Sequence, residues 1–476
     1  MADADGGEGA LIPEADGAMR FAADGEGALP LHVAGPEDLG DLPLEGPART
    51  WVEASGYRAG AGKVLLLPGA DGRLAGAVVG LGPEGRRARG RFTVAAARAA
   101  LPAGTWRLAG AHSSEARDEA ALGWLLAGYR FGRYCEAKPP RAALLPPEGC
   151  DAARLEAVAE GERITRTLID TPAADAGPAE IAAAAAALAA RHGAACEVTE
   201  GAALERGFPM IHAVGRAATP DRAPRLVDVR AGGEGPSVTL VGKGVSFDTG
   251  GLDLKPASSM ALMKKDMGGA AIVLGLLHML LATGARMRLR VLLPLAENAV
   301  AGGSVRPGDV LRSRAGPTVE VNNTDAEGRL ILADALALAA EEGPDALVSV
   351  ATLTGAARVA VGADIAAYFT GDERLASALD AAGARVRDPV WRLPFHDPYE
   401  DMIEPGIADL DNAPKGGLAG AITAALFLRR FAGDPARYTH LDVMAWTPSA
   451  APGRPKGGAG MGARALLEAL PEVLAP

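Results

Sequence analysis

Two segments of the chain combine ionisable side chains with glycine and apolar residues. Lys243–Gly251 begins with a lysine and places Asp248 five residues after it. Asn323–Leu330 carries three charged residues at alternate positions: Asp325, Glu327 and Arg329. Because a buried charge needs an opposite charge or a metal ion, we interpret the two segments as one carboxylate-rich site for divalent metals. Such a site indicates a hydrolase.

Four carboxylates are the candidate metal ligands: Asp248, Asp266, Asp325 and Glu327. We place Asp266 in the first turns of a predicted helix, from which it can turn back toward the strand ends. Asp325 and Glu327 flank one alanine, and in an extended segment this alternation puts both side chains on one side. Converging carboxylates repel one another and their pKa values rise. Two divalent cations about 3.5–4 Å apart would neutralise them and hold a bridging hydroxide.

A purely structural interpretation of these residues stays open. Asp325 and Glu327 could cap the helix that begins near them, since acidic side chains stabilise a helix N-terminus. Lys243, Lys255 and Arg329 would then be ordinary salt-bridge partners. For any one residue the structural and the functional interpretation are equally open, but the whole set favours the metal site.

The histidines offer no competing metal site, because none forms a paired zinc motif. Each is expected at the surface or as a hydrogen-bonded core residue. They are His32, His112, His192, His212, His278, His396 and His440. A metal in this protein must therefore be held largely by carboxylates.

Strand and helix patterns alternate from about residue 172 onward. The predicted strands are Arg225–Val229, Ser237–Val245, Met287–Pro294 and Ala346–Ala351. The predicted helices are Ile181–Arg191, Met260–Ala282, Ala326–Glu342 and Gly420–Phe431. This alternation favours a mixed, mostly parallel sheet flanked by helices. Ligands bind at the carboxyl ends of such strands, which is where Lys243 and Asp248 fall.

The first part of the chain predicts a smaller α/β domain. Its first 40 or so residues are rich in Gly, Pro, Asp and Glu and are expected to form loops and edge strands. Lys63–Pro68 and Ala75–Leu81 are predicted as strands and Glu115–Phe131 as a helix. We therefore expect an N-terminal domain over 1–150, a connecting helix over 151–170 and a catalytic domain over 171–476.

Composition narrows the classes of partner and compartment. The net charge of −11 argues against nonspecific nucleic-acid binding, which needs clustered Lys and Arg. Three irregularly spaced cysteines fit a reducing compartment rather than a disulfide framework. The acidic N-terminus lacks the pattern of a signal peptide, and the apolar runs fall short of the roughly 18 residues of a membrane span. We expect a cytoplasmic protein with no membrane association.

Six motifs carry a resemblance to a known family. The most specific is Asn323-Thr-Asp-Ala-Glu-Gly-Arg-Leu330, followed by Val241–Pro256 and Met263–Ala271. The others are Arg306–Val310, Ala351–Ala356 and Ala419–Leu428. Over about residues 163–470 the chain resembles the leucyl aminopeptidase (cytosol aminopeptidase) family. The first 150 residues resemble the variable N-terminal domain of that family only loosely.

The resemblance implies a metalloaminopeptidase with two metal sites. The tighter site matches Lys243, Asp248, Asp266 and Glu327, and the exchangeable site matches Asp248, Asp325 and Glu327. Lysine can bind a metal only as a neutral amine, and two adjacent cations would lower its pKa enough to supply one. Lys255 matches the family's electrophile, and Arg329 matches the residue that holds a bicarbonate. The planar guanidinium suits that role because it can bind a carbonate bidentately.

The family also implies the reaction and the partners. A hydroxide bridging two divalent ions, Zn or Mn in the first place and Mg or Co as alternatives, would hydrolyse the N-terminal residue from peptides. Binding of the free α-amine to one metal would explain why cleavage occurs only at the N-terminus. Intracellular peptide turnover and a homohexamer are expected on the same basis.

The pocket for the first substrate side chain matches Met263, Thr352, Gly355 and Met444. Relatives commonly have a small residue where this chain has Met444, so we expect a narrowed or reshaped pocket. Two alternative functions stay open. One is a dipeptidase such as a cysteinylglycinase, and the other is an accessory DNA-binding role that would use the basic run from Arg86 to Arg91.

Overall fold

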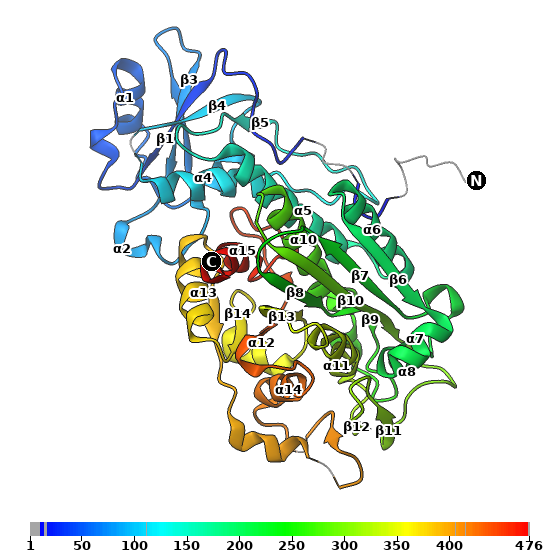
Figure 1. The fold of residues 1–476 in the computed structure, drawn as a ribbon. Helices are drawn as coiled ribbons and strands as arrows, with labels where there is room; N and C mark the ends of the chain where they lie inside the picture. The colour runs from blue at the N-terminus through cyan, green and yellow to red at the C-terminus, as the bar shows by residue number, and fades with distance from the viewer. Residues whose placement is uncertain (1–9, 14–16, 111, 405, 415, 475–476) are drawn as a thin grey trace, which may run out of the picture. The chain divides into compact units, whose positions relative to one another are not determined.

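The computed structural model describes residues 10–13, 17–110, 112–404, 406–414 and 416–474 (Figure 1). The chain divides into two compact units. One comprises Ile164–Thr447 and Gly457–Pro476 with a short N-terminal segment, and the other comprises Glu14–Arg163 and Pro448–Lys456. Helix α5 (Ala152–Asp170) contributes residues to both units.

The larger unit is built on one mixed sheet in the order β15-β14-β17-β13-β8-β10-β7-β6, with β9 pairing β10. Its strands are β6 (Ala195–Glu200), β7 (Arg225–Ala231), β8 (Ser237–Gly242), β9 (Gly244–Asp248), β10 (Arg288–Asn298), β13 (Ala346–Ala351), β14 (Ala366–Thr370), β15 (Val390–Arg392) and β17 (Tyr438–Asp442). The central pairs β17-β13, β13-β8 and β8-β10 are parallel, while β10-β7, β7-β6 and β17-β14 are antiparallel. The predicted mixed, mostly parallel sheet is confirmed.

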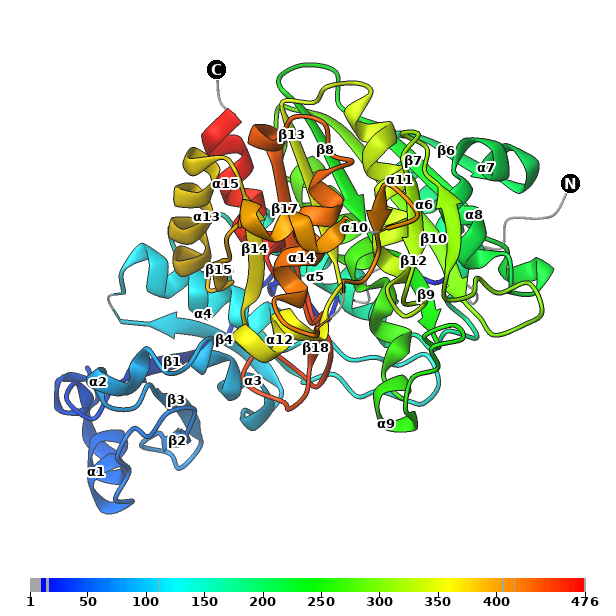
Figure 2. The ribbon, with the colours of Figure 1, turned by 90° about the horizontal axis from the view of Figure 1, so that it is seen from below.

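Helices cover both faces of this sheet (Figures 1 and 2). Alternate residues of a strand point to opposite faces, and Val241 of β8 packs in one apolar cluster with Leu330 and Leu336 of α11. The helices of the unit are α6 (Pro178–Arg191), α7 (Gly201–Gly207), α8 (Pro209–Gly215), α9 (Ala257–Met260), α10 (Gly268–Ala282), α11 (Glu327–Ala340), α12 (Gly355–Val361), α13 (Glu373–Arg385), α14 (Gly420–Arg429) and α15 (Ala463–Leu474). Short strands complete it: β11 (Asp309–Arg312), β12 (Thr318–Val321), β16 (Leu410–Asp411), β18 (Trp446–Thr447) and β19 (Gly457–Gly458).

Two predicted elements near the site are wrong in detail. The strand predicted over Ser237–Val245 is interrupted at Lys243, whose backbone N–H donates to Val350 O at 3.0 Å while its carbonyl accepts from Ala270 at 2.9 Å. The helix predicted over Met260–Ala282 begins only at Gly268, and Asp266 lies before it in a 3₁₀ segment, η4 (Met263–Met267). At both places the backbone is hydrogen-bonded to other segments, Lys243 to Val350 and Ala270, and Asp266 to Thr352.

The smaller unit is α/β, with a five-stranded sheet in the order β2-β3-β1-β4-β5. Its elements are β1 (Leu29–Ala34), β2 (Val64–Pro68), β3 (Leu74–Gly80), β4 (Gly104–Ala109), β5 (Ala142–Leu144), α1 (Gly46–Ala54), α2 (Glu84–Arg87), α3 (Ala96–Ala100) and α4 (Ser114–Leu126). The expectation of only loops and edge strands before residue 40 is wrong. Strand β1 is central and parallel to both neighbours, and its Leu31 and Ala34 are buried.

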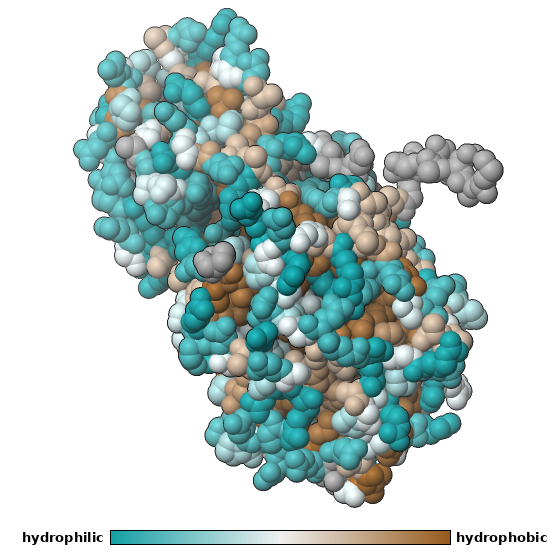
Figure 3. All heavy atoms as spheres, viewed as in Figure 1, coloured by the Kyte–Doolittle hydropathy of each residue, from teal (hydrophilic) through white to brown (hydrophobic). Residues whose placement is uncertain are grey.

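One stretch, Met263–Ala282, is long and apolar enough to cross a membrane, but 83% of its window is buried inside the protein. Its composition is therefore explained by packing against the sheet. On the face drawn in Figure 3, apolar residues lie in small groups among hydrophilic ones. No disulfide joins Cys135, Cys150 or Cys196.

Candidate metal centre

Lysines and carboxylates converge at the carboxyl ends of the central strands. Lys243 follows β8 directly, and Asp248 is the last residue of β9. Asp266 lies in η4, and Glu327 is the first residue of α11. Asp325 lies two residues earlier in a turn rather than in an extended segment, so the alternation argument for its direction was wrong although the two side chains do meet.

Each of two lysines pairs with two carboxylates. The Lys243 ammonium lies 2.7 Å from Asp266 Oδ2 and 2.9 Å from Glu327 Oε1. The Lys255 ammonium lies 2.8 Å from Asp248 Oδ2 and also pairs with Asp325 Oδ1. All four predicted carboxylates are thus brought together around positive charge. A pair of divalent cations is the other kind of group that could neutralise such a cluster.

Three of the carboxylates have the geometry of a metal site. Asp248, Asp325 and Glu327 each offer one oxygen, and these oxygens lie within 4.8 Å of one another. Within the described part of the chain, neither oxygen of Glu327 accepts a hydrogen bond, although its side chain is buried and Oε1 has the Lys243 ammonium as its ion-pair partner. Buried carboxylate oxygens normally have partners. Oxygen ligands with unused lone pairs fit a hard divalent cation.

The pKa values of these side chains are shifted by burial and by their charged neighbours. Burial, followed by repulsion from Asp248, raises the pKa of Glu327 to about 8 and that of Asp325 to about 6. Burial alone would lower the pKa of Lys243, but Asp266, Glu327 and Asp248 outweigh it and raise that pKa. Added positive charge would favour the ionised carboxylates, so the donor set fits metal binding.

Glycines allow the backbone to approach this cluster. Gly250 has φ 88°, and a Cβ there would meet Asp253 O at 2.5 Å and Asp325 Oδ1 at 3.0 Å. Gly251 has φ 64°, and its Cβ would meet Thr324 Oγ1 at 2.9 Å. A larger residue at either position would therefore be both strained and obstructed. Gly328, which the sequence reasoning missed, packs against Lys243, because a Cβ there would lie 2.5 Å from Lys243 Cε.

Polar residues that the sequence reasoning also missed hold the carboxylates in place. Asn298 Nδ2 donates to Asp248 Oδ1 at 2.9 Å, and Thr352 Oγ1 donates to Asp266 Oδ1 at 2.8 Å. Asn298 ends β10, beside the strand that carries Asp248. That position at a strand end was the only signal in the sequence.

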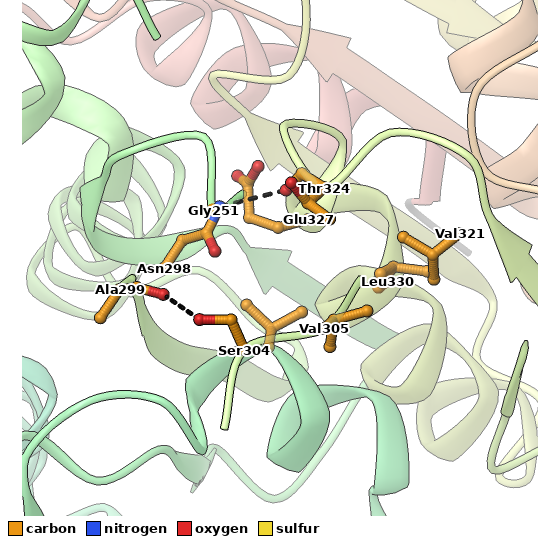
Figure 4. Close-up of a pocket in the computed structure, with 10 residues that line it drawn as sticks. Gly251, Asn298, Ala299, Ser304, Val305, Val321, Thr324, Glu327 and Leu330 are labelled. Carbon is orange, nitrogen blue, oxygen red and sulfur yellow. Dashed lines mark hydrogen bonds between the residues drawn. The ribbon is translucent and has the colours of Figure 1, made fainter. Parts of the chain in front are cut away.

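A small cavity adjoins Glu327 (Figure 4). It is lined by polar groups of Asn298, Thr324 and Glu327 and by apolar residues such as Val305 and Leu330. The volume open to the centre of a water molecule is about 10 Å³, which is about the size of one water site. Figure 4 shows the Glu327 carboxylate near Thr324 and Gly251.

Arg329 lies on α11, two residues after Glu327, and is partly exposed. One of its terminal nitrogens donates to Asn412 O. Among the described residues its other N–H groups make no hydrogen bond, so they are open to a planar anion. Burial lowers the pKa of this guanidinium to about 10, which still leaves it charged at neutral pH.

The four predicted pocket residues lie on three neighbouring segments. Met263 is on η4, Thr352 and Gly355 lie between β13 and the start of α12, and Met444 follows β17. Thr352 is buried and bound to Asp266, whereas Gly355 is exposed. The side chains of Met263 and Met444 are partly buried.

A lysine- and carboxylate-lined site at the carboxyl ends of parallel strands defines an α/β enzyme. Residues 163–467 match the catalytic domain of the cytosol aminopeptidase family, and residues 30–147 match the N-terminal domain of M17 aminopeptidases. The chain belongs to the cytosol aminopeptidase family. It is accordingly a hydrolase of peptides in a metal-dependent family.

Known relatives agree along most of the chain. A probable cytosol aminopeptidase of Roseiflexus castenholzii is 40% identical over 368 residues, which cover 73% of this chain and 75% of that protein. The crystal structure of a cytosol aminopeptidase from Coxiella burnetii superposes with a TM-score of 0.90 at 39% identity, covering 96% of this chain and 99% of that one. The bottromycin maturation enzyme BotP in complex with Mn superposes at 0.83 and 35% identity, covering 94% and 99%.

The two alternative functions gain no support from these comparisons. In the basic run considered for DNA binding, Arg87 lies 3.1 Å from Asp38 Oδ2 and also pairs with Glu37. Those carboxylates offset part of the positive charge that a phosphate backbone would need.

Proposed function

We propose that this protein is a two-metal aminopeptidase that removes N-terminal residues from peptides during turnover in the cytosol. The observation that carries the proposal is the gathering of Asp248, Asp266, Asp325 and Glu327 around two lysine ammonium groups at the strand ends. The alternative of isolated caps and salt bridges does not explain why these four carboxylates share one buried site.

Lys243, Asp248, Asp266 and Glu327 would hold one ion, and Asp248, Asp325 and Glu327 the other. When bound, the two ions supply Lewis acidity, which lowers the pKa of water and polarises a peptide carbonyl. Zn or Mn are the ions proposed first, with Mg or Co as alternatives, because carboxylate-rich sites accept all of them. Without metal, the neighbouring carboxylates stabilise the protonated ammonium of Lys243. To act as a ligand, Lys243 must lose that proton.

Lys255 would donate a hydrogen bond to the carbonyl oxygen of the scissile peptide as negative charge develops there. Its ammonium lies beside Asp248 and Asp325, so it is already aimed at the centre. Arg329 would hold a bicarbonate through its free N–H groups, and bicarbonate supplies a general base. Recognition of the free α-amine at the same centre would restrict cleavage to the N-terminal residue.

Hydrolysis of leucine p-nitroanilide and a panel of dipeptides tests the proposal. The protein is stripped with a chelator and then reloaded with Mn or Zn in the presence of bicarbonate. We expect activity to be lost on stripping and restored by metal. Failure of every metal and every substrate would refute the proposed function. An N-acetylated peptide serves as the control and should not be cleaved.

The homohexamer is also proposed on the basis of the family resemblance. Light scattering of the purified protein tests it directly, and a monomer at micromolar concentration would refute it.

A further inference from the structure

Lys265 is a buried lysine with no partner among the residues that the structure describes. Its residue exposure is 6%, yet its ammonium makes no hydrogen bond or ion pair in the described ranges. The lysines around it behave differently. Lys243 and Lys255 each pair with two carboxylates, and Lys264 donates to Asp170 O.

The carboxylates that act on Lys265 are already engaged. Asp266 and Asp442 are the negative groups that influence its ammonium. Asp266 accepts from Lys243 at 2.7 Å and from Thr352 at 2.8 Å. Asp442 accepts from Thr354 Oγ1 at 2.6 Å and from the N–H groups of Leu353 and Thr354 at 3.1 Å. Because a largely desolvated ammonium without a protein partner is costly, and the Lys265 side chain is largely buried, a ligand that supplies an acceptor would gain from pairing with it.

Lys265 lies where the segments of the proposed substrate pocket meet. It follows Met263 by two residues on η4. Two positive groups act on it: Lys243 of the metal centre, and Arg358 on α12, which begins at Gly355. Asp442 precedes Met444 by two residues on the third segment. Lys265 thus shares η4 with one expected pocket residue, and charged groups on the segments of the other expected pocket residues act on its ammonium.

We propose that Lys265 makes this enzyme select peptides whose first residue carries a side-chain carboxylate, aspartate or glutamate. The ammonium would form an ion pair with that carboxylate, while Met263 and Met444 contact the methylene groups. The inference rests on the proposed function, since it assigns a specificity to that same site. It gives Lys265 a substrate-positioning role, separate from metal binding.

Aminoacyl 7-amido-4-methylcoumarins of Glu, Gln, Asp, Asn, Leu and Met test the inference on the metal-loaded full-length protein. The pairs Glu/Gln and Asp/Asn are matched in size and differ in charge. We expect kcat/KM to be about tenfold or more higher for Glu than for Gln, as charge-assisted hydrogen bonds allow. Lys265→Met should bring this ratio close to one while retaining cleavage of the Leu substrate.

Lys264→Met is the matched control. It removes the same charge from the preceding residue, whose side chain donates to Asp170 O instead. It should leave the Glu/Gln ratio as in the wild type. Lys265→Glu should reverse the preference and favour a lysine substrate over a glutamate substrate.

The outcomes separate the two proposals. A wild-type Glu/Gln ratio near one, with Leu or Met substrates cleaved, overturns the role of Lys265 and leaves the aminopeptidase function intact. A high ratio that persists in folded Lys265→Met assigns the preference to another cation and also overturns it. No cleavage of any substrate by the metal-loaded wild type refutes both. The wild-type ratio needs no variant, so the inference stays testable even if Lys265→Met does not fold.

Discussion

His440 is expected to make the larger unit sensitive to acid. Its ring is fully buried on β17, with Nδ1 2.8 Å from Ser349 Oγ and the ring stacked on Phe369 at 6.0 Å between centroids. Nε2 has no partner among the described residues. Burial lowers the pKa of His440 from 6.5 to about 3, because the charged ring would lose its hydration without gaining an acceptor at Nε2.

The size of the effect follows from this pKa. In the unfolded chain the ring takes up a proton below pH 6.5, while in the folded protein it stays neutral down to about pH 3. The unfolded state therefore binds more protons between these limits, and stability falls as the pH is lowered through this window. Each pH unit well below 6.5 costs about 1.4 kcal/mol, which gives a loss of about 2 kcal/mol at pH 5 relative to pH 8.

His440→Phe removes the titrating group and keeps a ring against Phe369. Urea unfolding of metal-stripped protein at pH 8 and pH 5 measures the change for wild type and variant. Between pH 8 and pH 5, we expect the free energy of unfolding to fall by about 2 kcal/mol less in His440→Phe than in the wild type. The other acidic and basic groups are common to both proteins. The exposed His396→Phe is the control and should follow the wild type. Equal pH dependence in His440→Phe and wild type would refute the reasoning.

Three further predictions concern the metal centre. Lys255→Met should lower kcat by about 100-fold or more while the protein still binds two metals, because the variant lacks the group that stabilises the transition state. Near-normal turnover in the metal-loaded variant, measured alongside its metal content, would contradict that role. Glu327→Gln should lower bound metal, measured by plasma emission spectroscopy, because it removes the charge of the carboxylate assigned to both ions; two ions retained per chain would argue against its place in both sites. Gly328→Ala should lower activity and metal content although no ligand changes, since its Cβ would lie 2.5 Å from Lys243 Cε; unchanged loading would show that Lys243 is not held in this way.

Much of the fold could be predicted because the central strands are buried on both faces and form apolar runs. Ala346–Ala351 belongs to this type, and it was predicted with the observed bounds. Strand β1 was missed, since Pro30 and the glycine-rich residues before it are typical of loops. Its central position depends on pairing with β3 and β4, which are distant in sequence.

The ligand types could be predicted from the two motifs, but their support could not. Asn298, at the end of β10, reaches Asp248, and Thr352, directly after β13, reaches Asp266; the order of these strands in the sheet is not visible in the sequence. Lys265 was also missed, because the adjacent Lys264 and Asp266 suggest an ordinary charged turn. Only the three-dimensional structure shows that Lys264 donates to Asp170 O, while Lys265 is a buried residue with no partner among the described residues.

The glycines around the centre determine its geometry as much as the ligands do. A Cβ on Gly269 would lie 2.1 Å from Val350 O, and one on Gly242 would lie 2.6 Å from Ala270 Cα. These contacts place the start of α10 directly against β8 and β13, and Asp266 lies just before that start. Lys243, at the break between β8 and β9, is thereby brought within 2.7 Å of Asp266. A chain with every carboxylate and lysine but a larger residue at Gly269 would hold Asp266 away from Lys243, so the same ligand set would no longer form one site.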